Sequence, residues 1–136
     1  MADFMSPKQR SAHMAKIRSK DTKPELILRR KLHGEGYRYR LHDNSLPGKP
    51  DLVFPGRRKV IFVNGCFWHG HDCSVGRRLP KTNTDFWQAK RTRNQQRDHM
   101  QRLELVSSQW QYLDVWECEI SNDPTLLTRV RSFLLQ

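Results

Sequence analysis

The hydrophobic and polar positions of this chain follow two periods, which predict where helices and strands lie. After Thr22, leucines recur at four-residue spacing, and Glu25 stands three positions beyond Thr22 in a capping-box pattern. This segment predicts a helix that ends at Gly34 or Gly36, where glycine can adopt a left-handed stop. A shorter amphipathic pattern over residues 11–18 predicts one or two helical turns before it.

Strand patterns occupy the middle of the chain. Residues 37–41 alternate apolar side chains with arginines, which is typical of a half-buried strand. Residues 51–54 and 60–63 flank a turn at Pro55-Gly56 and predict a hairpin. Because residues 60–63 are all apolar, we expect a central strand that is covered on both faces.

The remaining third of the chain predicts two helices around one strand. A long helix is expected over residues 84–106, capped by Thr84 or Asp85, followed by a strand over 112–116 and a helix that opens at Asp123-Pro124. The resulting order, α-α-β-β-β-α-β-α, indicates an α/β fold with a mixed sheet flanked by helices. We expect a basic N-terminal arm over residues 1–20 and a single domain over residues 21–136.

The composition indicates which class of binding partner to expect. The chain has 136 residues with 25 Lys and Arg against 14 Asp and Glu, a formal net charge of +11. Such an excess attracts polyanions, with nucleic acid as the first candidate and an anionic membrane surface as the second. Four Trp, six Phe and three Tyr argue against a disordered polyelectrolyte. Neither a membrane-spanning apolar run nor a signal peptide is evident, so we expect no membrane span and no secretion.

The three cysteines and one histidine form a candidate metal site. Cys66, His71 and Cys73 lie within eight residues, and Cys118 follows much later. Three thiols and one imidazole make a complete tetrahedral set for structural zinc. The alternative is a group of buried thiols with a surface histidine. An odd number of cysteines argues against a closed disulfide framework, and we therefore expect a reducing cytoplasm.

One acidic residue and one further histidine are candidate catalytic groups. Pro50-Asp51 at the start of a strand resembles the front half of the PD-(D/E)xK nuclease signature, in which the Asp binds Mg²⁺. The acid and the lysine that should follow on the next strand are replaced by Phe62-Val63-Asn64. His69 lies between two of the candidate zinc ligands and is therefore held near a fixed loop, so a functional role stands beside the alternative of an ordinary surface histidine.

Aromatic residues beside the candidate metal loop have two interpretations. Phe67 and Trp68 would form a small core around the metal, or a rigid wedge that inserts between bases. On the predicted long helix, four side chains share one face by three- and four-residue spacing: Trp87, Lys90, Asn94 and Asp98. This face would be solvated or would lie against DNA.

Several motifs together carry a family resemblance. They are Arg10-Ser11 with Met14 and Ile17, Asp21-Thr22-x-Pro24-Glu25, Leu46-Pro47-Gly48-x-Pro50-Asp51, Gly65-Cys66-Phe67-Trp68-His69-x-His71-x-Cys73, Phe86-Trp87 with Lys90, Asn94 and Arg97-Asp98, and Trp116-Glu117-Cys118. In this pattern, which spans nearly the whole chain, the sequence resembles the very short patch repair (Vsr) endonucleases. The resemblance implies a restriction-endonuclease-like fold and a Mg²⁺-dependent nick in double-stranded DNA, 5′ of the T in a T:G mismatch.

The resemblance also implies a biological setting. Such mismatches arise when 5-methylcytosine is deaminated, so the nick would start very short patch repair and link the protein to a cytosine-5 DNA methyltransferase. We therefore expect a bacterial cytoplasmic enzyme associated with the nucleoid. A nick in one strand needs only a monomer.

The resemblance assigns roles to individual residues. Asp51 and the main-chain carbonyl of Val63 would bind Mg²⁺, His69 would act as general base, and Glu25 and Asp98 would position waters around the metal ion. The implied structural zinc ligands are Cys66, His71, Cys73 and Cys118. The implied mismatch wedge consists of Phe67, Trp68 and Trp87, while the N-terminal arm embraces the duplex.

One position departs from the family pattern. The best-known members have a histidine where this chain has Asn64, and an amide donates hydrogen bonds but carries no charge near pH 7. Asn64 therefore bears on how the phosphate or the leaving group is stabilised. Two other functions stay open: a non-catalytic, zinc-stabilised DNA-binding module, and a sequence-specific restriction-type nuclease that cuts both strands.

Overall fold

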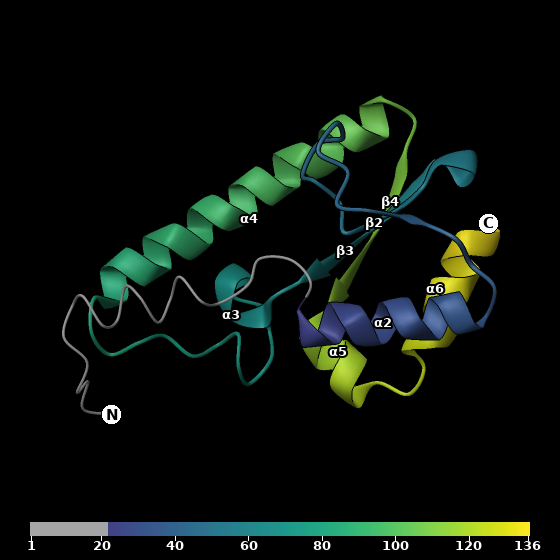
Figure 1. Cartoon of the computed structure of the whole chain (residues 1–136). Coiled ribbons are helices and arrows are strands. Elements are labelled where there is room, and N and C mark those ends of the chain that lie inside the picture. Colours follow the sequence, from purple (N-terminus) through teal and green to yellow (C-terminus); the bar gives the residue numbers. More distant parts are fainter. Residues whose placement is uncertain (1–21) are drawn as a thin grey trace.

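A four-stranded mixed sheet lies between helices in the computed structural model, which describes residues 22–136 (Figure 1). The strands stand in the order β1 (Arg40–Leu41), β2 (Leu52–Phe54), β3 (Lys59–Asn64) and β4 (Gln111–Trp116). Neighbours β1 to β3 pair antiparallel, and β4 pairs parallel with β3. The predicted mixed α/β fold is confirmed. The predicted N-terminal arm and its helix over residues 11–18 lie outside the described residues.

Helices cover both faces of this sheet. Three of them, α2 (Lys23–Gly34), α5 (Glu117–Asn122) and α6 (Leu126–Leu135), pack on one face, and α4 (Thr84–Ser107) crosses the other. The short α3 (Cys66–His69) follows directly after β3. This arrangement brings the end of β3 and the beginning of β2 close to α4.

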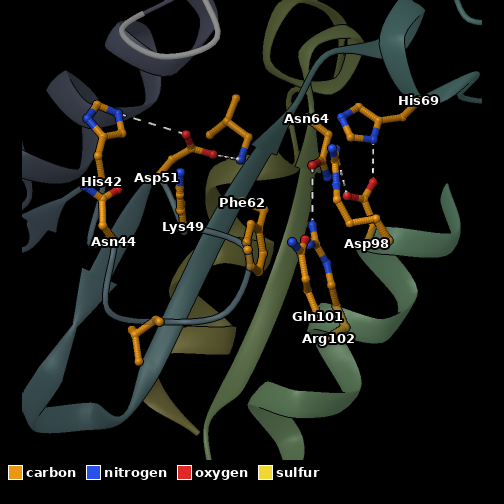
Figure 2. Close-up of a pocket in the computed structure, with 14 residues that line it drawn as sticks. His42, Asn44, Lys49, Asp51, Phe62, Asn64, His69, Asp98, Gln101 and Arg102 are labelled. Atoms are coloured by element: carbon orange, nitrogen blue, oxygen red, sulfur yellow. Dashed lines mark hydrogen bonds and ion pairs between the residues drawn. The ribbon is translucent and has the colours of Figure 1, made fainter. Parts of the chain in front are cut away.

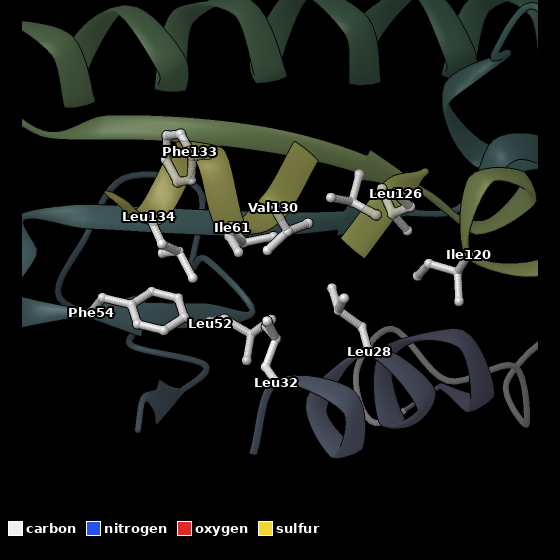
Figure 3. Packing of buried hydrophobic residues seen from close by; sticks show 11 residues of the cluster. Leu28, Leu32, Leu52, Phe54, Ile61, Ile120, Leu126, Val130, Phe133 and Leu134 are labelled. Carbon is white, nitrogen blue, oxygen red and sulfur yellow. The ribbon is translucent and has the colours of Figure 1, made fainter. Parts of the chain in front are cut away.

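Alternation along β2 and β3 divides the core into two clusters. Leu52 and Ile61 face α2 and α6 in the larger cluster (Figure 3), whereas Val60 and Phe62 pack with Leu105 of α4 in the smaller one. Because period-2 alternation sends neighbouring side chains to opposite faces, every apolar residue of β3 has a helix to pack against. The expectation of a central strand covered on both faces is confirmed.

Some local predictions differ from the structure. The strand expected over residues 37–41 shortens to Arg40–Leu41, because only these two residues pair with β2; the rings of Tyr37 and Tyr39 still pack edge-on against Phe54, at centroid distances of 6.5 and 6.0 Å. The predicted cap of α4 is wrong: its N-cap is Asn83, at φ 58°, and the Thr84 hydroxyl donates to the Pro80 carbonyl at 2.8 Å. The short helices α3 and α5 were not predicted. Among residues 22–136, no helix combines the length and apolar character needed to cross a membrane.

Candidate active site and metal centre

A cavity of about 590 Å³ lies where the end of β3, the segment before β2, α3 and α4 meet (Figure 2). Most of the predicted catalytic residues line it: Asp51, Val63, Asn64, His69 and Asp98. Lys49, Arg97 and Arg102 line the same cavity and add positive charge to its wall. The cavity therefore joins acidic groups, two imidazoles and cations that the sequence separates by up to 60 positions, from His42 to Arg102.

Asp51 lies in a cluster with a second acid and a histidine. The main-chain N–H of Val63 donates to Asp51 Oδ2 at 2.7 Å, which holds the carboxylate against the end of β3. His42 Nε2 lies 2.9 Å from Glu25 Oε2 and 4.0 Å from Asp51 Oδ1. One ligand atom from each of the three residues lies within 4.8 Å of the other two. The cluster thus offers two carboxylates and one imidazole to a divalent cation.

Burial raises the free-energy cost of ionising the two carboxyl groups of this cluster. Glu25 is only 1% exposed, and its carboxylate hydrogen-bonds Arg29 as well as His42. Burial, together with the negative charge of Glu25, raises the pKa of Asp51 to about 7, although the Val63 N–H opposes this shift. A buried carboxyl group next to a partly buried one favours a bound cation, since the cation would offset the cost of keeping both ionised.

Glu25 has a different partner from the one that its capping-box position predicts. Thr22 caps α2 as expected, because its hydroxyl oxygen accepts the Glu25 N–H at 3.4 Å. The Glu25 carboxylate instead faces His42 in the cluster. His42 itself was missed by the sequence reasoning. Only the observed register, in which Leu41 pairs with Leu52, brings His42 opposite Asp51.

His69 is positioned by α4. Its Nδ1 donates to Asp98 Oδ2 at 2.5 Å, so the imidazole is oriented by a carboxylate. Three other α4 side chains donate to main-chain carbonyls of α3: Arg91 Nε to Phe67 (2.7 Å), Asn94 Nδ2 to Trp68 (2.9 Å) and Gln95 Nε2 to His69 (2.7 Å). The helix face that was predicted to be solvated or to lie against DNA therefore packs against α3.

Asn64 belongs to a network that the sequence did not reveal. Its Nδ2 donates to Asp114 Oδ1 on the neighbouring β4 at 2.9 Å. Arg102 of α4 donates to the same Asp114 oxygen at 2.6 Å, and its guanidinium carbon lies 3.5 Å from the centre of the Phe62 ring. Asn64 is only 6% exposed. The amide is thus held in place, with a buried cation beside it.

The three predicted wedge residues form one aromatic cluster. Phe67 contacts Trp68 and Trp87 at ring-centroid distances of 5.2 and 5.6 Å, and the two tryptophans lie 5.7 Å apart. Lys90 Nζ lies 5.2 Å from the Trp68 ring centre, within cation–π range. All three aromatic side chains are partly exposed. The cluster therefore lies at the surface formed by α3 and the beginning of α4, outside the hydrophobic core.

The four predicted zinc ligands also converge. Cys66 begins α3, His71 and Cys73 follow in the next loop, and Cys118 lies in α5; one ligand atom from each lies within 4.8 Å of the others. The His71 ring stacks on Trp116 at 4.1 Å, which fixes its orientation. Three thiols and one imidazole can hold a metal ion, and this donor set is consistent with zinc.

The cysteines of this cluster differ in their electrostatic surroundings. Burial raises the pKa of the Cys66 thiol to about 12. A hydrogen bond from the Gly76 N–H, at 3.3 Å, is the main cause that lowers the pKa of Cys73 to about 6. Gly76 comes so close to His71 that a β-carbon would lie 1.9 Å from the His71 carbonyl oxygen. The loop therefore needs glycine there to close around the metal-binding side chains.

Replacing the thiol of Cys118 tests the predicted zinc site. Cys118→Ser is expected to lose bound zinc and to lower the melting temperature by about 10 °C or more, since structural zinc contributes on the order of 10 kcal/mol to folding. Elemental analysis and thermal unfolding measure both effects. Ser121→Ala, on the exposed side of α5, is the matched control. Unchanged zinc content in Cys118→Ser would contradict this ligand assignment.

Comparison with known proteins identifies the family of this chain. The family model described as "DNA mismatch endonuclease Vsr" matches residues 2–75. The type II nicking enzyme V.XorIIP of Xanthomonas oryzae pv. oryzae is 47% identical over 134 residues, which cover 98% of each chain. The DNA mismatch endonuclease Vsr of Escherichia coli K12 is 42% identical over 120 residues, covering 88% of this chain and 76% of that protein. The chain therefore belongs to the Vsr family of DNA endonucleases.

Proposed function

We propose that this protein nicks one strand of double-stranded DNA, 5′ of the T in a T:G mismatch produced by deamination of 5-methylcytosine. The nick would start very short patch repair in the bacterial cytoplasm, at the nucleoid, and would serve DNA modified by a cytosine-5 methyltransferase. The main support is the cavity that Asp51, His69 and Asp98 line together, in which Asp98 orients His69 and Asp51 belongs to a cluster with the buried Glu25. The names of the relatives, a mismatch endonuclease and a nicking enzyme, support cleavage of a single strand.

His69 is the general base of this proposal. Asp98 accepts the Nδ1 proton, so Nε2 keeps a lone pair that can take a proton from the attacking water. The same pairing stabilises the imidazolium that forms when the water is deprotonated. In-line attack on the scissile phosphate then leaves a 5′-phosphate and a 3′-hydroxyl. Asp98 acts through His69 and is a positioning residue.

Asp51 and the Val63 carbonyl would hold Mg²⁺, with Glu25 beside them. Within a β-strand, the N–H and C=O of one residue point toward the same neighbouring strand. Because the Val63 N–H donates to Asp51, its carbonyl oxygen faces the same side of β3. Oxygen donors suit Mg²⁺. When bound, Mg²⁺ stabilises negative charge on the scissile phosphate. The separate Cys/His cluster would hold Zn²⁺ and fix the loop that carries His69.

Phosphate neutralisation falls to the cations of the cavity, Arg102 among them, in this proposal. Asn64 has no charge, and one of its N–H groups is already used by Asp114. Arg102 lines the same cavity and keeps its guanidinium beside Asn64 and Asp114. A guanidinium remains charged at all physiological pH values, but Asp114 offsets part of this charge, so Arg102 would share the neutralisation with Lys49 and Arg97 of the same cavity.

DNA distortion would come from the aromatic cluster. Phe67, Trp68 and Trp87 are partly exposed and adjoin His69 through α3, so inserting them beside the mismatch would bring the neighbouring phosphate to the cavity. The basic arm over residues 1–20 would hold the duplex. Because a single cavity suffices for a single nick, we propose a monomer.

Binding should depend steeply on salt. With a net charge of +11 and about 6–10 phosphate contacts, affinity for a T:G duplex is expected to fall about 10³–10⁵-fold between about 50 and 200 mM salt, because binding releases condensed counterions. Fluorescence anisotropy in EDTA measures this slope without cleavage. A slope near zero would contradict binding through the phosphate backbone.

End-labelled duplexes test the proposal against its two alternatives. We expect a nick in one strand of a T:G duplex with Mg²⁺ and none in a T:A duplex or in EDTA. Binding of the T:G duplex without any cut would favour the DNA-binding module. A double-strand break in fully paired DNA would favour the restriction-type nuclease.

A further inference from the structure

His42 lies between the two acids of the candidate catalytic metal site. Its Nε2 is 2.9 Å from Glu25 Oε2 and 4.0 Å from Asp51 Oδ1, and Figure 2 shows the ring turned toward Asp51. The side chain is only 18% exposed and lines the cavity. None of the roles proposed above uses this imidazole.

The backbone fixes His42 in this place. Pairing of Leu41 with Leu52 places the next residue, His42, opposite Asp51, and the His42 N–H donates to the Asp51 carbonyl at 3.2 Å. His42 also adopts φ 48°, a left-handed conformation that is uncommon for a residue other than glycine. The position of the ring therefore follows from the register of β1 and β2.

The donor distances suit a common metal ion. Ligand atoms about 2.1 Å from an octahedral ion lie about 3 Å apart when adjacent and about 4.2 Å apart when opposite. The distances of 2.9 and 4.0 Å from His42 Nε2 to its two carboxylate neighbours fall within this range. Mg²⁺ takes oxygen ligands almost exclusively, whereas first-row transition metal ions also take imidazole.

We propose that His42 Nε2 is a further protein ligand of the divalent cation that Asp51 holds beside Glu25, so that the site binds Mn²⁺ more tightly than Mg²⁺. The inference rests on the proposed function, because it takes Asp51 as a ligand of the catalytic cation. On binding, the ion replaces the hydrogen bond between His42 and Glu25, and His42 releases any proton on Nε2 to solvent.

Electron paramagnetic resonance of Mn²⁺ bound to the zinc-loaded full chain tests this directly, without DNA and without turnover. The wild-type protein should show electron spin-echo modulation from a directly bound ¹⁴N nucleus, and ¹⁵N-histidine labelling should change its frequency. His42→Gln should remove the modulation and raise the Kd of Mn²⁺ by about tenfold or more, with a smaller effect on Mg²⁺. The exposed His33→Gln on α2 should change neither property.

The outcomes separate this inference from the proposed function. Bound Mn²⁺ without nitrogen modulation, or no Mn²⁺ binding at all, would overturn the ligand assignment even if the protein nicks T:G duplexes with Mg²⁺. Equal losses of Mn²⁺ and Mg²⁺ affinity in His42→Gln would also overturn it. If His42 only held Glu25 in place, its loss would lower the affinity for both ions alike. Nitrogen modulation in a protein that does not nick would support the ligand while the proposed function failed.

Discussion

Asp51→Asn is expected to reduce nicking of a T:G duplex by about 10³-fold or more. An amide removes the negative charge that the cation needs, and the charge stabilisation lost on the scissile phosphate is worth several kcal/mol. The Val63 N–H that donates to Asp51 can still donate to the amide oxygen, so the fold should survive. Single-turnover rates with saturating enzyme measure the effect without a contribution from product release.

Zinc content and DNA affinity are the controls for this variant. Both should match the wild type, because the Cys/His cluster and the aromatic cluster do not include Asp51. Glu104→Gln, an exposed substitution on α4 with the same change of charge, should nick at the normal rate. Metal-dependent nicking retained by Asp51→Asn would defeat the assignment of Asp51 as a ligand.

His69→Ala is expected to lose about 10²–10⁴-fold in nicking rate, the usual contribution of a positioned general base. Its affinity for the mismatch should stay close to that of the wild type, because Phe67, Trp68 and Trp87 remain in place. Asp98→Asn should lose less, since the imidazole remains but loses the carboxylate that orients it. The comparison needs single-turnover rates beside anisotropy-based Kd values.

The exposed His33→Ala serves as the matched histidine control and should leave both quantities unchanged. A normal nicking rate in His69→Ala would show that another group takes the proton. A loss of mismatch binding equal to the loss of rate would instead indicate that His69 supports the position of α3 and not the chemistry.

Local patterns were enough to predict the elements with clear periodicity. The leucines of α2, the apolar run of β3 and the length of α4 all correspond to elements in the structure. The short helices α3 and α5, of four and six residues, were missed because so few residues carry no helical period. The cap of α4 was misplaced because Asn83 begins the helix from a left-handed backbone conformation and not from a side-chain cap.

Site residues were predictable where the chemistry is concentrated in one segment. Cys66, His69, His71 and Cys73 lie so close in sequence that their types alone indicate a loop with metal ligands. His42 and Arg102 were missed because their contacts depend on strand register and on the packing of α4. The pairing of Arg102 with Asp114 requires β4 to lie beside β3, and neither residue carries a local signal of that arrangement.

The most direct test of the proposed function is to map the cut in a duplex whose two strands carry different labels, comparing T:G with T:A under single-turnover conditions. We predict one product, from the strand that contains the mismatched T, cut 5′ of that T and ending in a 5′-phosphate and a 3′-hydroxyl. We predict no product from its partner strand or from the T:A duplex. Cuts in both strands, or equal rates on the T:G and T:A duplexes, would contradict mismatch-specific nicking.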